Sequence, residues 1–106
     1  MATIDDFRKL ELKVAEIVSV EVHPNADRLW LLQVRIGSEE RRIVAGIKAF
    51  YTPEQLVGKK VVVVANLEPA VIRGVESQGM LLAASTEGEL AIVIPEKNLP
   101  SGSVVK

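Results

Sequence analysis

Cysteine is absent from this sequence, and histidine occurs only once. Without cysteine the chain can form neither disulfides nor thiolate metal sites. A nucleophilic triad would have to use His23, which precedes Pro24 in a predicted turn, and no neighbouring residue marks a partner for it. We therefore expect His23 to be exposed and without a catalytic role, and we expect no enzymatic activity, metal or cofactor.

Long apolar runs and phosphate-binding loops are also missing. No run approaches the ~20 apolar residues of a membrane span, and the N-terminus lacks the layout of a signal peptide. Gly74 and Gly79 are not spaced for a Walker or dinucleotide-binding motif, and they precede a predicted strand instead of a helix. The length of 106 residues suits one domain, residues 1–106. We expect a cytoplasmic protein without membrane association.

Aromatic side chains make up only 4% of the chain, so few are free to stack on nucleic-acid bases. Trp30 has the parity of Leu32 and Val34 on a predicted strand, which favours a place in the core. The net charge is −1, but residues 28–73 carry eight basic and four acidic side chains between acidic flanks. Chance scatter on a solvated surface is the simpler interpretation. The alternative is a local cationic face that binds a shaped polyanion.

Local patterns predict two short helices among strands. Thr3 to Asp6 has the form of a capping box, and a helix should run from there to about Leu10. Thr52-Pro53-Glu54-Gln55 combines an N-cap hydroxyl, an N1 proline and a capping glutamine, with Gly58 placed to end the helix. The predicted strands are 10–22, 28–36, 41–46, "KKVVVVANL", and "MLLAAS" with "LAIVI". The alternation of the first strand breaks at residues 16–17, which indicates a bulge.

The order of elements is strand, strand, strand, helix, strand, strand. It contains no alternating βαβ units. Five strands with a helix between the third and the fourth are typical of the oligonucleotide/oligosaccharide-binding (OB) fold. We therefore predict an all-β protein with small α content, a five-stranded OB-fold barrel with a short N-terminal helix. The stretch "VIRGVESQGM", residues 71–80, is predicted to be a loop between two buried strands.

Cationic and polar side chains remain as candidates for binding. Such side chains suit the phosphates and 2′-hydroxyls of a folded RNA better than its splayed bases. They are Arg28, Arg41, Arg42, Lys48, Lys59, Lys60 and Arg73, with Asn25, Asn66, Ser77 and Gln78.

Four stretches resemble the tRNA-binding domain family, whose members are small free-standing dimers, extensions or β chains of methionyl-tRNA synthetases, and synthetase cofactors. They are "DFRKLELKVAEIVSVEVHPNADRLWLLQV", "RRIVAGI", "YTPEQLVGKKVVVVANLEP" and "RGVESQGMLLAA". The resemblance implies an OB barrel with a C-terminal extension that forms a homodimer. It also implies binding to the outer corner of the tRNA L-shape, alone or as an auxiliary of methionyl-tRNA synthetase.

The resemblance further implies that Arg42, Asn66, Arg73, Ser77 and Met80 lie near the RNA. Where relatives often carry lysine or arginine after "NLxP", this chain has Ala-Val-Ile at 70–72. Arg73 is then the only cation of that stretch, so we expect the affinity either to be weaker or to come more from Arg41, Arg42 and Lys48. The predicted tRNA-binding set is Arg41, Arg42, Lys48, Asn66, Arg73, Ser77, Gln78 and Met80.

A second function is possible with the same fold. A bacterial branch that looks similar has been assigned chaperone-like peptide binding in protein export. That function would use an apolar groove between two subunits, whereas tRNA binding would use the cationic face. The basic middle third favours RNA without excluding the peptide alternative.

Overall fold

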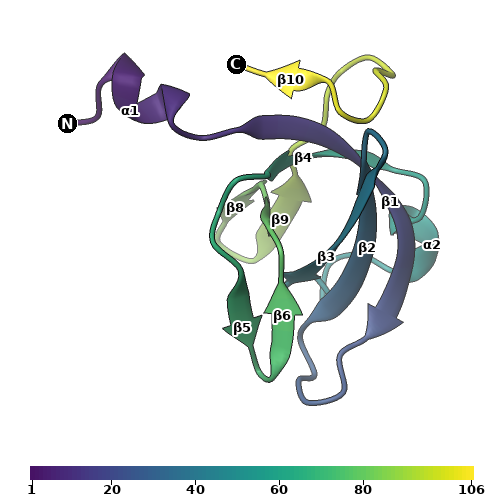
Figure 1. Ribbon diagram of the computed structural model, residues 1–106. Coiled ribbons are helices and arrows are strands. Elements are labelled where there is room, and N and C mark those ends of the chain that lie inside the picture. Colours follow the sequence, from purple (N-terminus) through teal and green to yellow (C-terminus); the bar gives the residue numbers. More distant parts are fainter.

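The computed structural model describes residues 1–106, and its centre is a curled antiparallel sheet (Figure 1). The strand order is β3-β2-β1-β4-β7, with β10 also paired to β1. These strands are β1 Leu12–Val22, β2 Trp30–Ile36, β3 Glu39–Ala45, β4 Lys60–Val64, β7 Met80–Leu81 and β10 Val104–Val105. Two hairpins pair separately: β5 Ala70–Ile72 with β6 Val75–Ser77, and β8 Ala83–Thr86 with β9 Glu89–Ile92. The predicted mostly β architecture is confirmed, with ten strands where five were expected.

The long strand β1 curls because it contains a bulge. Its register with β2 shifts between Ile17 and Ser19, so the predicted bulge is confirmed. The extra residue changes which parity faces the core, from Ala15 and Ile17 before it to Val20 after it. The even-numbered Val14 is also buried, although it lies on the opposite face of β1. Next to it the C-terminal segment runs along β1, and the Val14 N–H donates to the carbonyl of Ser103 at 2.9 Å. The first half of β1 is thus covered by the C-terminal segment.

Strands β2 and β4 supply much of the core. Trp30, with only 8% of its surface exposed, lies in the core cluster with the other residues of its parity on β2, as predicted. Its indole Nε1 donates to the carbonyl of Tyr51 at 2.8 Å. Residues 61–64 of β4 are all valines and all buried, so the prediction of a central strand buried on both faces is confirmed.

Both predicted helices form, each with a complete capping box. Helix α2, Pro53–Leu56, lies between β3 and β4 in the chain, and its Leu56 is fully buried. Helix α1, Ile4–Arg8, buries none of its residues and stands away from the sheet, on the same side as β10 (Figure 1). Neither helix has the length or the apolar character needed to cross a membrane.

Two predictions for the second half of the chain are wrong. Residues 71–80 are not a loop, because most of them form the hairpin β5–β6 and the start of β7. Arg73 and Gly74, with φ of +52° and +88°, form the two-residue turn, as in a type I′ hairpin. The run "MLLAAS" is not a buried strand throughout, because β8 is exposed and pairs only with β9. Its alanines and serine offer little apolar surface to bury.

Candidate functional site

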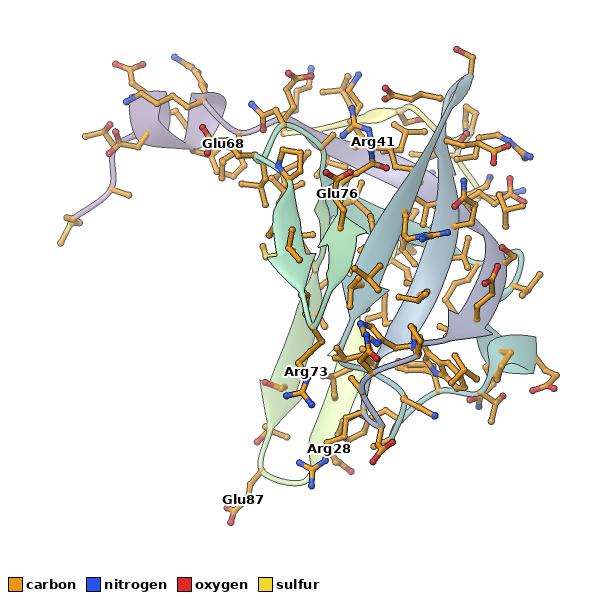
Figure 2. The ribbon with its side chains drawn as sticks, turned by 60° about the horizontal axis from the view of Figure 1, so that its bottom comes forward. Arg28, Arg41, Glu68, Arg73, Glu76 and Glu87 are labelled. Carbon is orange, nitrogen blue, oxygen red and sulfur yellow. The ribbon has the colours of Figure 1, made fainter.

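The predicted site residues do not form one patch. Figure 2 shows Arg41 near one end of the molecule and Arg73 near the other. We call the residues around the start of β3, namely Arg41, Arg42, Ser77 and Gln78, the β3 cluster. We call the depression lined by Ala26, Asp27, Arg28, Leu29 and Arg73 the loop notch.

Arg41 is used by the fold. It has the parity of the core residues Ile43 and Ala45, so its side chain lies on the inner face of the sheet. Its guanidinium donates to the carbonyls of Ala65 and Gln78 and forms an ion pair with Glu39 at 2.8 Å. Only 24% of the side chain is exposed. Arg41 therefore links β3 to the end of β4 and to the segment before β7.

Arg42 points the other way and its guanidinium has no protein partner. Only its backbone is engaged: its N–H donates to Gln78 Oε1 at 3.1 Å, and its carbonyl accepts from the Gln78 N–H at 2.8 Å. The residue lines a shallow polar depression of about 260 Å³, which Arg41 also borders, together with Glu40 and Glu76. These two carboxylates weaken the attraction of Arg42 for an anion.

The hydroxyl of Ser77 is also used by the fold. The residue is 3% exposed, and its Oγ accepts from the Val44 N–H at 3.0 Å and donates to the Gly79 carbonyl at 3.1 Å. This conformation leaves the hydroxyl out of reach of an RNA. Met80 is 47% exposed at the start of β7, where it pairs with Val64.

Asn66 and Lys48 have local partners as well. Asn66 Oδ1 accepts from the Glu11 N–H at 2.8 Å and its Nδ2 donates to the Lys9 carbonyl at 2.7 Å, which ties the end of β4 to the segment after α1. The Lys48 ammonium lies 4.9 Å from the centre of the Trp30 ring, within range of a cation–π interaction. Of these two side chains, only the charge of Lys48 is available to a phosphate.

His23 is buried, so the prediction that it would be exposed is wrong. It is 3% exposed, and its Nδ1 accepts from the Asn25 N–H at 2.9 Å. The other nitrogen, Nε2, therefore carries the proton and donates to the Ile72 carbonyl at 3.0 Å. Burial follows because the turn after β1 packs against hairpin β5–β6, whose existence the sequence analysis missed.

Arg28 lines the same depression as Arg73, a residue of the predicted set. It was one of the cationic candidates but was left out of the predicted set, and the structure brings it to the loop notch with Arg73. Its position directly after the turn residues Asn25 to Asp27 was the available signal, because turn residues and their neighbours are usually exposed.

Comparison with known proteins agrees with the predicted family. A family model described as "Putative tRNA binding domain" matches residues 12–104. The chain belongs to this tRNA-binding domain family. It is 58% identical over 102 residues to a methionine–tRNA ligase of Methanococcus aeolicus, and the match covers 96% of this chain but 15% of that enzyme. Against the methionine–tRNA ligase of Deinococcus radiodurans the identity is 51% over 107 residues, with coverage of 100% and 16%. The chain thus spans about a sixth of the length of these relatives.

Two solved structures resemble this member of the family over the whole chain. The methionyl-tRNA-synthetase-related protein from Pyrococcus horikoshii has a TM-score of 0.92 and 38% identity, with coverage of 100% of this chain and 98% of that one. The chaperone CsaA from Bacillus anthracis has a TM-score of 0.89 and 27% identity, with coverage of 100% and 99%. The names of these two proteins match the two functions that the sequence left open.

Proposed function

We propose that this chain is a non-catalytic module that binds folded tRNA, built as one OB-fold domain over residues 1–106. The strand order β3-β2-β1-β4-β7, with α2 between β3 and β4, supports the OB fold. Membership of the tRNA-binding domain family supports the ligand. A protein that binds tRNA in translation would be located in the cytoplasm.

The observation that carries the proposal is a set of exposed arginines without carboxylate partners. Arg28, Arg42 and Arg73 form no ion pair, whereas Arg8, Arg35 and Arg41 all do. An arginine with no acidic partner is free to contact a phosphate. Because Trp30 is in the core, recognition would depend on the spacing of phosphates and sugars in a folded RNA instead of on base stacking.

We further propose that the module serves methionyl-tRNA synthetase, either within the same chain or as a separate subunit. The two methionine–tRNA ligases contain a segment that is at least half identical to this chain. A module of this kind would add tRNA affinity to a catalytic chain by raising the local concentration of tRNA.

The deciding experiment is a titration of the protein with folded tRNA and with an unstructured RNA of the same length, at two salt concentrations. We expect tighter binding to the folded RNA. The logarithm of the affinity should fall with the logarithm of the salt concentration by about 0.7–0.9 per phosphate contact. Equal affinity for the two RNAs would contradict recognition by shape.

We also propose that the module is a homodimer through α1 and β10. An isolated helix of five residues is unstable in water, yet α1 buries none of its side chains against its own chain. Ile4, Phe7 and Leu10 are exposed and line a groove with the exposed Val104 of β10. A second copy of the chain would cover this apolar surface.

Substituting Phe7→Glu should break that dimer, because a carboxylate would be buried in an apolar interface. Light scattering should then give about 11.5 kDa for the variant and twice that mass for the unaltered protein. Phe50→Glu, an exposed aromatic outside α1 and β10, is the matched control and should stay dimeric. A monomeric unaltered protein at micromolar concentration would contradict the proposal.

Peptide binding remains the second candidate. An open hollow of about 600 Å³ beside hairpin β8–β9 is lined by the apolar side chains Phe50, Tyr51, Leu90 and Ala91 among others. The likeness to the chaperone CsaA is the other support. Unfolded apolar peptides that displace tRNA, or that bind while tRNA does not, would favour this function.

A further inference from the structure

The loop notch brings together two arginines that are far apart in the sequence. Arg28 comes from the connection between β1 and β2, and Arg73 from the turn of hairpin β5–β6. Both line an open depression of about 360 Å³, and Figure 2 shows their guanidinium groups at the same end of the molecule. Asp27 also lines it but forms an ion pair with neither arginine, so the depression carries two cations and one carboxylate.

Hydrogen bonds hold the two loops against each other. His23 Nε2 donates to the Ile72 carbonyl at 3.0 Å, and Asn25 Nδ2 donates to the Arg73 carbonyl at 3.1 Å. In return, Arg73 Nη2 donates to the Asn25 carbonyl at 3.3 Å. We call these three bonds the latch. Since residues of both loops donate and accept, these bonds hold the turn that carries Arg73 against the connection that carries Arg28 before any ligand arrives.

The backbone of Arg73 is unusual for its residue type. It is the one non-glycine residue with positive φ, at +52°, although asparagine or glycine is the usual choice at this turn position. A non-glycine residue in this conformation costs roughly 1–2 kcal/mol. Turn formation alone therefore does not explain an arginine here, and its charge becomes the more informative property.

We propose that the loop notch binds one phosphate of the tRNA backbone between the guanidinium groups of Arg28 and Arg73. Arg28 is thereby assigned as a binding residue, with His23 and Asn25 as positioning residues. The inference rests on the proposed tRNA function. Guanidinium groups are planar forks that bind phosphate oxygens in pairs, and two of them around one depression repel each other until an anion arrives. A phosphate bound there relieves that repulsion.

The first test compares Arg28→Ala with Arg35→Ala in titrations with folded tRNA. Arg35 is already paired with Glu16 and Glu40, so its loss changes the net charge equally without removing an unpaired cation. We expect Arg28→Ala to weaken binding by about tenfold, the size of one charge-assisted hydrogen bond. The salt dependence should also fall by the ~0.7–0.9 of one phosphate contact. If Arg28→Ala binds tRNA as tightly as Arg35→Ala does, the proposal that the loop notch binds a phosphate is overturned.

The second test uses Arg73→Asn, which removes the charge but keeps the turn. Asparagine followed by Gly74 is a favoured type I′ pair, so thermal stability should be equal or higher while tRNA affinity falls by about tenfold. In the double variant Arg28→Ala/Arg73→Asn, the total reduction in affinity should stay well below the product of the reductions in the two single variants. The salt dependence should fall only by the value for one phosphate contact. If the two reductions in affinity multiply and the salt dependence falls by the value for two phosphate contacts, the proposal that both arginines contact the same phosphate is overturned.

The positioning role of His23 has its own readout. His23→Ala should weaken tRNA binding in the unaltered protein but should cause no further loss of affinity when Arg28→Ala and Arg73→Asn are already present. A histidine that only maintains the fold would lower affinity equally in both backgrounds, and that result would overturn the positioning role. Failure of the unaltered protein to bind tRNA would refute the proposed function itself, which is a different outcome from all of these.

Discussion

Arg41 in the β3 cluster and Arg73 in the loop notch both donate to backbone carbonyls of distant segments. Arg41 does so twice, is paired with Glu39 and is 24% exposed, whereas Arg73 makes one such bond and has no carboxylate partner. The difference follows from their positions, since Arg41 lies on the inner face of a strand and Arg73 at the tip of a hairpin. Arg41 near the core thus maintains the fold, whereas the charge of Arg73 at the hairpin tip is not offset by a carboxylate.

The same contrast separates neighbours within the β3 cluster. Ser77 and Arg41 have their polar atoms used by the protein, while Arg42, which has the opposite parity on β3, has a free guanidinium. Variants of Arg41 and Ser77 should therefore change mainly stability, and variants of Arg42 and of the arginines of the loop notch mainly affinity.

The largest effect is expected from Gly79→Ala, which disturbs the segment that holds Gln78 against β3. Gly79 has φ of +147°, and an added Cβ would lie 3.1 Å from the Val64 carbonyl oxygen. A strained conformation and a tight contact with the backbone of β4 together should lower the free energy of unfolding by about 2–4 kcal/mol. Urea denaturation measures this difference.

Gly88→Ala is the matched control for that experiment. Gly88 also has positive φ, +78°, but no atom lies within 4 Å of its added Cβ. Only the backbone strain applies, so the free energy of unfolding should fall by about 1 kcal/mol. Equal changes from Gly79→Ala and Gly88→Ala would mean that close packing at Gly79 contributes nothing.

Arg41→Ala should lower the free energy of unfolding by about 1–2 kcal/mol, because the charge-assisted bonds to the carbonyls of Ala65 and Gln78 are removed. Arg35→Ala removes an arginine that is 43% exposed, whose surface ion pairs are worth at most about 1 kcal/mol. Thermal or urea unfolding of the two variants gives the comparison. If Arg41→Ala instead left stability intact and weakened tRNA binding, Arg41 would be a binding residue and not one that maintains the fold.

Local interactions made much of the fold predictable. The capping boxes of α1 and α2, the parity of β2 and the bulge in β1 each depend on residues a few positions apart, and each is confirmed. The inward direction of Arg41 could also have been read from its parity with Ile43. Strand parity alone would therefore have separated Arg41 from Arg42 in the predicted site.

Contacts between distant segments were not predictable in this way. The burial of His23 depends on Ile72, which lies 49 positions away. Hairpin β5–β6 was missed because its turn is Arg-Gly instead of the usual asparagine-glycine pair. Once the hairpin was taken for a loop, neither the latch nor the pairing of Arg28 with Arg73 in one notch could be inferred.

The smallest effect is expected at Arg42, where the comparison between the two regions is most sensitive. Its guanidinium is as free as that of Arg28, but Glu40 and Glu76 line the same depression and offset its charge. Arg42→Ala should therefore leave stability within about 0.5 kcal/mol and weaken tRNA binding by about threefold, less than Arg28→Ala. Glu76→Gln, which removes one of the two carboxylates, should strengthen binding by a similar factor if a phosphate approaches this depression. No change in either variant would restrict the tRNA contact to the loop notch, whereas a larger reduction in affinity at Arg42 than at Arg28 would make the β3 cluster the main binding region.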